Sequence, residues 1–354
     1  MRKNYIDNLR WFSVLLLFPY HAAMMYNDWG ESFYVYNKAI KSISAFIIAT
    51  YTWFMPLLFV LAGISSCYAL QKRTPKEYVK ERFEKLFIPL IFGILLLVPV
   101  QTFYAECFHN GYTGSYFEQY ILFFTKFSDL TGYTGGFTIG HLWFIQFLFV
   151  ISLVALPLMR IYLKSERKLD GKRMTFIKLI PLFVIPLLMS LVLDFGGKSV
   201  GKYFSLFMLG FLIFSNNDVI DRLEKNRWTL FISAIMLIIA KLVTYFGFGF
   251  AKGNLVGVFD NFIMWICIMA FLGMGKRYFN GRTKVTDYLS KASFPIYILH
   301  QSCLVATAYY VMHFVSTVAV QYFLIIFISA VVTFAVYEIF KRIPVTRFIF
   351  AIKK

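Results

Sequence analysis

Hydrophobic residues along this chain gather in long runs that short polar or basic connections separate. The ten runs that we expect to cross a membrane cover residues 9–27, 43–70, 86–104, 141–163, 176–194, 202–215, 228–247, 255–274, 293–314 and 319–340. A helix that rises about 1.5 Å per residue needs roughly 20 residues to cross a hydrocarbon core of about 30 Å. The runs lack the two-residue alternation of barrel strands, and only helices or closed barrels satisfy their backbone groups in lipid. The pattern therefore predicts an all-α fold, a polytopic transmembrane helical bundle of about ten spans that occupies residues 1–354 as a single membrane-embedded domain.

Two segments fit this pattern less well than the others. The apolar stretch at 206–214 is short for a span, and the outer connection at 106–140 is long and rich in Gly, Tyr and Thr. Either segment could be re-entrant. Composition supports the membrane interpretation, because 59% of the residues are hydrophobic and only 15% are charged, which excludes an ordinary soluble globular domain.

The chain carries a formal net charge of +18, which invites a nucleic-acid interpretation. Its basic residues concentrate instead in alternate connections and in the C-terminal tail, at 71–85, 164–178, 222–227, 276–291 and 341–354. This distribution is what the positive-inside rule predicts for cytoplasmic segments, although local binding of anionic ligands remains compatible with it. We therefore expect a multi-pass protein of the cell membrane with both termini in the cytoplasm and no nucleic-acid partner.

The N-terminal segment resembles a signal peptide, because a short basic stretch precedes an apolar run. Arg10 and His21 interrupt that run, however, and no small-residue cleavage site follows it. We expect it to be the first spanning helix. The four cysteines show no CxxC pairing, so neither a disulfide framework nor a zinc site is expected.

Ionisable residues inside the first run are informative, because a charge at bilayer depth is costly. Arg10 and His21 are eleven residues apart, which at about 100° per residue places them on one helical face about 16 Å apart along the axis. Asp7 precedes Arg10 by three residues and joins that face. Histidine suits proton abstraction near neutral pH and arginine suits phosphate groups, a combination that fits acyl-CoA chemistry. The alternative is an arginine that snorkels to the rim and a histidine that is hydrogen-bonded into the bundle, and spacing alone does not decide between them.

Five stretches together resemble the integral membrane acyltransferases of family 3, and in particular the branch that modifies periplasmic glucans. These stretches are Asp7-Asn8-Leu9-Arg10 with His21, Phe59-Val60-Leu61-Ala62-Gly63, Arg82-Phe83-Glu84-Lys85 with Pro89, His141-Leu142-Trp143-Phe144, and Phe294-Pro295-Ile296-Tyr297-Ile298-Leu299-His300. The resemblance implies that His21 is catalytic. The chain departs from the family pattern at Ala62, where serine is usual, and at Lys85, where a second arginine is frequent.

The resemblance also implies a donor site at the cytoplasmic face, where Arg82 and Lys85 would join Arg10 in holding the phosphates of acyl-CoA. Ordinary positive-inside charge is the competing explanation for Arg82 and Lys85. His141 and Trp143 are candidates for acceptor binding, although an aromatic belt explains a tryptophan and a hydrogen-bonding cap explains a histidine at a helix start.

Three further side chains have two explanations each. His300 either lines the donor path or is a structural histidine, and Asp7 shares these alternatives. Glu106, near an outer helix end, could assist the acceptor hydroxyl as a second catalytic residue or could be a solvated carboxylate. Lys241 and Asp260 fall at similar depth in neighbouring spans, so we expect an intramembrane ion pair.

These observations favour an enzyme that moves an acetyl or other short acyl group, such as succinyl, from cytoplasmic acyl-CoA to a hydroxyl of an extracytoplasmic glycan. Acetyl-CoA is the first candidate for the co-substrate, and no metal is expected. His21 would act as general base or as an acylated nucleophile. The alternative function is a transporter or flippase for a glycan precursor or anionic metabolite, and a scaffold without chemistry is a third possibility.

Overall fold

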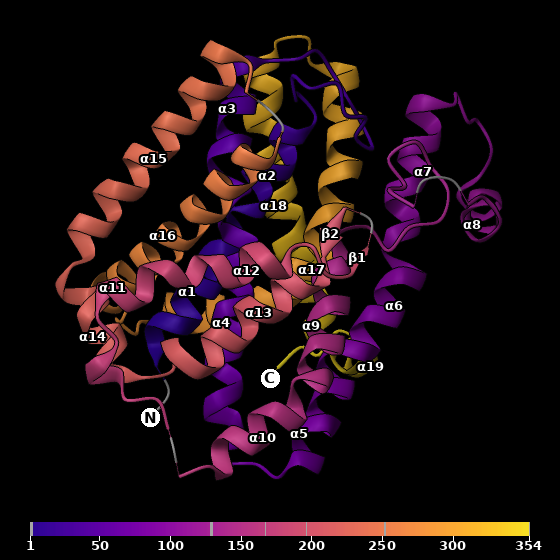
Figure 1. The fold of residues 1–354 in the computed structure, drawn as a ribbon. Helices are drawn as coiled ribbons and strands as arrows, with labels where there is room; N and C mark the ends of the chain where they lie inside the picture. Colours follow the sequence, from indigo (N-terminus) through magenta and orange to yellow (C-terminus); the bar gives the residue numbers. More distant parts are fainter. Residues whose placement is uncertain (1–2, 128–129, 167, 196, 251–252, 354) are drawn as a thin grey trace. The chain divides into compact units, whose positions relative to one another are not determined.

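Helices make up almost all of the regular structure of the protein (Figure 1). This computed structural model describes residues 3–127, 130–166, 168–195, 197–250 and 253–353. The described chain forms two compact units that interleave along the sequence. Unit 1 comprises Met1–Ser13, Ile48–Arg82 and Phe147–Ser290, and unit 2 comprises Val14–Ile47, Phe83–Gln146 and Lys291–Lys354. Four helices continue from one unit into the other, namely α1 (Asn4–Leu15), α3 (Lys41–Thr50), α9 (Trp143–Val154) and α17 (Lys284–Phe314).

Unit 1 contains most of the middle of the chain. Its other elements are α4 (Phe54–Leu70), α5 (Pro75–Arg82), α10 (Leu156–Lys164), a 3₁₀ turn η3 (Gly171–Arg173), α11 (Phe176–Leu179), a 3₁₀ turn η4 (Ile180–Phe183), α12 (Val184–Met189), the strands β1 (Asp194–Phe195) and β2 (Lys198–Ser199), α13 (Val200–Leu209), a π-helical turn η5 (Gly210–Phe214), α14 (Asn217–Lys225), α15 (Arg227–Phe248) and α16 (Asn254–Tyr278). The two strands pair antiparallel, with Asp194 opposite Ser199.

Glycines allow the tightest helix contact of unit 1, between α4 and the α13–η5 segment. A Cβ atom at Gly63 would lie 1.9 Å from the carbonyl oxygen of Phe207, and one at Gly210 would lie 2.3 Å from that of Val60. Backbone therefore meets backbone at both places, an approach that only residues without a side chain permit. Helices α15 and α16 form a second pair, drawn in orange in Figure 1.

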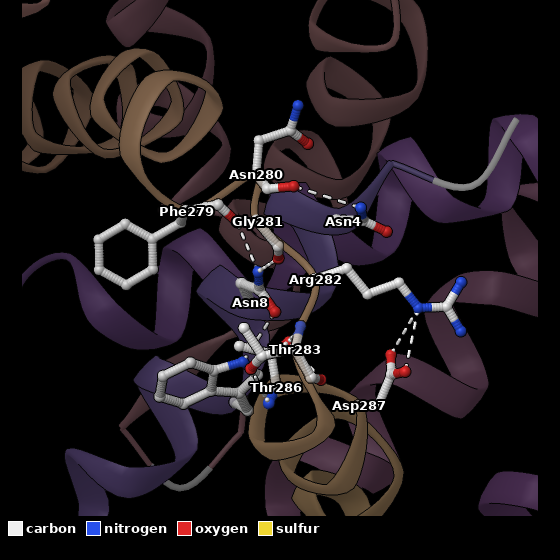
Figure 2. Close-up of polar contacts among 10 residues, drawn as sticks. Asn4, Asn8, Phe279, Asn280, Gly281, Arg282, Thr283, Thr286 and Asp287 are labelled. Atoms are coloured by element: carbon white, nitrogen blue, oxygen red, sulfur yellow. Dashed lines mark hydrogen bonds and ion pairs between the residues drawn. The ribbon is translucent and has the colours of Figure 1, made fainter.

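The connection between α16 and α17 is fastened to α1 by side-chain amides. Figure 2 shows Asn8 with its Nδ2 atom donating to the carbonyl oxygens of Phe279 and Gly281, at 2.5 and 2.9 Å. Asn4 donates to the carbonyl oxygen of Asn280 at 3.2 Å. These bonds satisfy carbonyls that follow the end of α16, where no helical partner is left for them. Asn8 belongs to the first motif of the sequence, so this motif has a structural function besides any chemistry.

Unit 2 contains α2, the C-terminal helices and the long connection between α7 and η2. Its other elements are α2 (Leu17–Met24), a π-helical turn η1 (Phe83–Phe87), α6 (Ile88–Leu96), α7 (Val98–His109), α8 (Tyr116–Thr125), a 3₁₀ turn η2 (Gly140–Leu142), α18 (Val318–Arg342) and α19 (Pro344–Ile349). Helix α2 packs along α18 (Figure 1). The hydroxyl of Tyr322 donates to the carbonyl oxygen of Pro19 at 3.1 Å, and that of Tyr26 donates to Gln321 Oε1 at 3.1 Å.

Five stretches of the described residues are long and apolar enough to cross a membrane: Lys41–Leu70, Pro75–His109, Arg227–Phe248, Asn254–Tyr278 and Val318–Arg342. Two more qualify as bent pairs, Gly140–Val154 with Leu156–Lys164 at 45° and Val200–Phe214 with Asn217–Lys225 at 92°. The all-α membrane architecture is confirmed, whereas the count of ten spans is not. The 92° bend falls at the segment that the sequence marks as short, and it fits a broken span or a re-entrant loop.

The three remaining expected spans each have a feature that the hydrophobic pattern alone does not reveal. The N-terminal run is divided at Leu16 into α1 and α2. The apolar helix at Phe176–Met189 is shorter than a span requires. Helix α17 carries His300, Gln301 and Ser302 within its apolar part and begins nine residues before the expected start at residue 293. The cytoplasmic position of both termini and the single domain over 1–354 stay predictions.

Candidate active site

Three histidines that are far apart in the sequence meet inside unit 2. His21 lies on α2, His141 in the turn η2 and His300 on α17. The ring centroids of His21 and His300 are 5.4 Å apart, and those of His141 and His300 are 5.1 Å apart. We call these three residues the histidine cluster. Since ionisable side chains are rare inside apolar helices and mark functional sites there, the cluster is the candidate active site.

His21 is the member of the cluster that is only half-buried. Its ring stacks on Phe33 with centroids 6.0 Å apart and planes 13° from parallel, and it meets Tyr20 edge-on at 5.3 Å. Its Nδ1 atom is buried without a hydrogen-bond partner in the described residues. No described residue therefore engages this nitrogen of His21.

His141 is held by hydrogen bonds at both ring nitrogens. Its Nε2 atom lies 2.9 Å from the carbonyl oxygen of Ile298, and its Nδ1 atom lies 3.2 Å from Gln101 Nε2. A carbonyl only accepts and an amide nitrogen only donates, so this network assigns the proton to Nε2 and leaves Nδ1 as the acceptor. Gln101 Nε2 also donates to Ser302 Oγ at 2.9 Å, and Ser302 Oγ donates to the carbonyl oxygen of Leu97 at 2.8 Å.

His300 has one engaged and one open nitrogen. Its Nδ1 atom donates to the carbonyl oxygen of Tyr297 at 2.6 Å, and its Nε2 atom is buried without a partner in the described residues. The hydroxyl of Tyr297 in turn donates to the carbonyl oxygen of His141. The engaged Nδ1–H leaves a lone pair on Nε2, so His300 can accept a proton or a hydrogen bond beside His21.

A cavity of about 490 Å³ lies in unit 2, and its lining includes Leu299 and Ser302, which flank His300 in the sequence. Its walls are apolar and come from Leu97 and the helices α7, α17 and α18. Ser302, which Gln101 connects to His141, is one of the residues that line it. The volume falls in the range of about 300–1,000 Å³ that small-molecule sites occupy.

Glu106 lies near the outer end of α7 and is buried, with 2% of its surface exposed. Its Oε1 atom forms an ion pair with Lys126 Nζ at 2.7 Å, and its Oε2 atom accepts a bond from Asn110 Nδ2 at 2.5 Å. The interpretation of Glu106 as a solvated carboxylate is therefore wrong, because both of its oxygens bind other side chains inside the protein. A catalytic role for Glu106 stays a prediction.

The candidate donor residues Arg10 and Arg82 belong to unit 1. Arg10 forms the expected pair with Asp7, at 2.9 Å, and its Nη2 atom donates to Ser65 Oγ at 2.9 Å. The guanidinium of Arg82 lies 4.4 Å from the ring centre of Tyr78, and its Nε atom is buried without a hydrogen-bond partner in the described residues. Both arginines thus have local partners, so neither side chain merely extends into water.

Lys85 and Trp143 belong to unit 2 and lie at less buried positions. Lys85 is exposed within the turn η1, and Trp143 is half-buried at the start of α9, edge-on to Phe144 at 6.4 Å. The role of Lys85 in donor binding and that of Trp143 in acceptor binding stay predictions. The expectation that Arg10 and His21 share one helical face also stays a prediction. Within the described residues, no group of three His, Cys, Asp or Glu side chains could hold a metal ion.

Sequence reasoning missed several residues that complete the cluster. Gln101 and Ser302 connect His141 to the cavity wall, and Phe33 stacks on His21. An amide and a hydroxyl inside apolar runs are a usable signal, because such groups need a partner in lipid. Phe33 gives no such signal, since the chain contains 42 phenylalanines.

Comparison with known proteins assigns the chain to a family. A family model described as an acyltransferase domain matches residues 3–338. The chain is similar to proteins named glucans biosynthesis protein C from Salmonella paratyphi B and Salmonella agona, with 24% identity over 379 aligned positions that cover 99% of this chain and 94% of each relative. No solved structure matches it. Because the family model covers nearly all of a chain that is rich in long apolar helices, this protein belongs to the integral membrane acyltransferases of family 3, as its motifs predict.

Proposed function

We propose that this acyltransferase moves a short acyl group from acyl-CoA to a hydroxyl of a glycan outside the cytoplasm. Two similar proteins carry glucan biosynthesis in their names, which supports a glycan acceptor. The observation that carries the proposal is the contact between His21 and His300, two imidazoles 5.4 Å apart that each bury a nitrogen without a partner in the described residues.

His21 is the general base in this proposal. The acceptor hydroxyl loses its proton to the imidazole while its oxygen attacks the thioester carbonyl carbon, and the C–S bond of the tetrahedral intermediate then breaks. The imidazolium returns the proton to the departing thiolate, so the enzyme ends in its starting state. His300 accepts a hydrogen bond from His21 or from the substrate through Nε2. An acyl group carried transiently on His21 is the competing route.

Arg10, Arg82 and Lys85 hold the phosphates of CoA at the cytoplasmic face in this proposal. Guanidinium groups bind phosphate through two parallel hydrogen bonds, and a lysine supplies a point charge. Asp7 and Ser65 orient the guanidinium of Arg10 through the two bonds described above. A donor held at its phosphates has fewer orientations to lose before the reaction, and such positioning can supply about 7–11 kcal/mol of barrier lowering.

Transfer of radiolabel from acetyl-CoA or succinyl-CoA to a soluble glucan, by purified protein in liposomes, tests the proposal. The native protein is compared with His21→Ala and with His313→Ala, an exposed histidine at the end of α17 that serves as the matched control. We expect His21→Ala to lose at least about 100-fold in rate, as general-base catalysis supplies 10²–10⁴-fold, and His313→Ala to keep the native rate.

Equal rates in native and His21→Ala protein would remove His21 from the mechanism. Absence of transfer from every donor, together with movement of labelled glucan across the liposome membrane, would instead support the transporter. Gel filtration and circular dichroism of each variant verify that it is folded. For the donor site, Arg10→Ala should raise the KM for acyl-CoA more than it lowers kcat.

A further inference from the structure

The orientation of His21 depends on packing, because its buried Nδ1 atom has no hydrogen-bond partner in the described residues. Phe33 supplies the parallel contact, with its ring 6.0 Å from that of His21. Tyr133 packs against Phe33 and Tyr34, with ring centroids 5.1 Å and 5.2 Å away, and we call these three rings the wall beside His21. Whatever holds Phe33 and Tyr133 in place therefore also orients the imidazole.

Tyr133 belongs to an irregular segment of the outer connection, residues 130–140, which we call the strap. Thr138 ties the strap to itself, because its hydroxyl donates to the carbonyl oxygen of Leu130 at 2.7 Å and accepts from the backbone N–H of Gly140 at 2.9 Å. The strap contains no helix before Gly140, so these bonds replace regular structure. Its position relative to the wall has to be fixed by neighbours.

Glu106 on α7 provides that fixed point. A Cβ atom at Gly135 would lie 2.1 Å from Glu106 Oε1, so the strap backbone passes directly over the carboxylate, in a conformation with φ +96° that favours glycine. Asn110 bonds to Glu106 through its Nδ2 atom and to the carbonyl oxygen of Thr134 at 2.8 Å. Lys126 pairs with Glu106, and its carbonyl oxygen accepts the N–H of Phe137 at 2.8 Å.

Helix α7 anchors the other part of the wall as well. His109 lies three residues after Glu106, so the two side chains share one helical face. Its Nε2 atom lies 2.7 Å from the carbonyl oxygen of Phe33. One face of α7 thus holds Phe33 directly and holds Tyr133 through the strap.

We propose that Glu106 and Lys126 are positioning residues, whose ion pair fixes the strap so that Tyr133 and Phe33 orient His21 for catalysis. The proposal rests on the proposed function of His21 and assigns Glu106 a different role from that of an acid or base in contact with substrate. It predicts that what matters at positions 106 and 126 is a pair of opposite charges, in either order. A carboxylate that itself exchanges protons with the acceptor cannot be replaced by the reverse pair.

The test compares the native protein with Glu106→Gln, Lys126→Met, and the exchanged pair Glu106→Lys with Lys126→Glu. Glu118→Gln is the matched control, because it makes the same change on exposed α8. Two readouts are made on each intact, folded protein: kcat and KM for acyl transfer, and the rate at which diethylpyrocarbonate modifies His21, followed by peptide mass spectrometry. The second readout does not require any enzymatic activity.

We expect Glu106→Gln and Lys126→Met to lower kcat by about 10- to 100-fold, the loss that a misplacement of about 1 Å can cause, with less change in KM. Both should also change the modification rate of His21 severalfold. The exchanged pair restores the ion pair but not the bond that Asn110 donates to Glu106, so it should recover at least about threefold of each change relative to Glu106→Gln. An exchanged pair as impaired as Glu106→Gln, with unchanged His21 modification in both, would overturn the proposal. Failure of acyl transfer in the native protein would count against the proposed function, while His21 modification would still test the strap.

Discussion

The ion pair between Lys241 on α15 and Asp260 on α16 has the geometry that the sequence predicts for neighbouring antiparallel spans. Lys241 Nζ lies 2.6 Å from Asp260 Oδ1, and the two side chains are 7% and 18% exposed. Tyr51 completes the group, because its hydroxyl accepts from Lys241 Nζ at 3.0 Å and donates to Asp260 Oδ2 at 2.8 Å. The ammonium also lies 4.2 Å from the centre of the Tyr51 ring.

Removing one charge from this group should cost more than removing both. Lys241→Met leaves a buried carboxylate whose described partners are the Tyr51 hydroxyl and the charge of Lys202, and buried charges that lose their ion-pair partner cost about 3–5 kcal/mol. The double replacement Lys241→Met with Asp260→Leu removes both desolvation penalties, so we expect its cost to stay below about 2 kcal/mol. Tyr51→Phe, which removes two hydrogen bonds and keeps the ring, should cost about 1–3 kcal/mol.

The assay is a double-mutant cycle on unfolding in mixed detergent micelles, with the free energy of unfolding obtained for native, both single variants and the double variant. A coupling energy of at least about 2 kcal/mol is expected, since residues in one network do not behave additively. Single-variant costs that add to within about 0.5 kcal/mol in the double variant would refute the reasoning. Such a result would mean that water or lipid headgroups solvate both charges.

Three further changes test separate parts of the fold. Gly63→Ala should lower the melting temperature measurably, at a cost of about 1–3 kcal/mol or more, because its Cβ atom would lie 1.9 Å from the carbonyl oxygen of Phe207; an unchanged melting curve would contradict the close contact. Hydrogen bonds from the backbone N–H and the hydroxyl of Ser115 lower the pKa of the Glu118 carboxyl below its ordinary value of 4.5. The ionised carboxylate therefore stabilises the start of α8 at pH values above 4.5, and this stabilisation is lost as the pH falls through the lowered pKa. The protection factors of the α8 amides, which are exchange rates corrected for the intrinsic effect of pH, should therefore fall in acid in the native protein but not in Glu118→Gln. Gln101→Leu should reduce kcat and destabilise by about 1–3 kcal/mol, and native kinetics in this variant would exclude a role for the bridge to His141.

Helical spacing was a reliable guide where both partners lie on one helix or on two consecutive antiparallel helices. Asp7 and Arg10 are three residues apart on α1, and their predicted proximity appears as an ion pair. Lys241 and Asp260 were predicted from the depth of two antiparallel helices that a short connection joins, and that pair is confirmed too. In both cases helical geometry alone determines which residues can meet.

The histidine cluster could not be assembled in the same way. His21, His141 and His300 come from three distant parts of the chain, and their meeting depends on how α2, η2 and α17 pack. The family motifs contain all three residues but carry no distances. The partner of Glu106 could not be predicted from spacing either, because Lys126 lies 20 residues later, after the end of α8.

Departures from regular helix geometry were the least predictable feature. Proline signals some of these breaks: the division of the first run at Leu16 falls just after Leu15, whose carbonyl cannot accept a hydrogen bond from Pro19 and is crowded by the proline ring. The bend of 92° between Phe214 and Asn217 was visible only as an unusually short apolar stretch. Counting spans from hydropathy assumes straight helices, and this chain contains too many turns of other kinds for that assumption to hold.

The π-helical turn at Phe83–Phe87 has a consequence for protein engineering. A π turn inside an α-helix contains one residue more than the regular repeat, so the residues after it are rotated by about 100° relative to an uninterrupted helix. Deleting Glu84 should remove the extra residue and restore the regular repeat between Phe83 and α6. Substituting Glu84 would not produce this effect. The number of residues in this one turn, rather than the identity of any side chain in it, therefore sets the helical phase with which α6 begins.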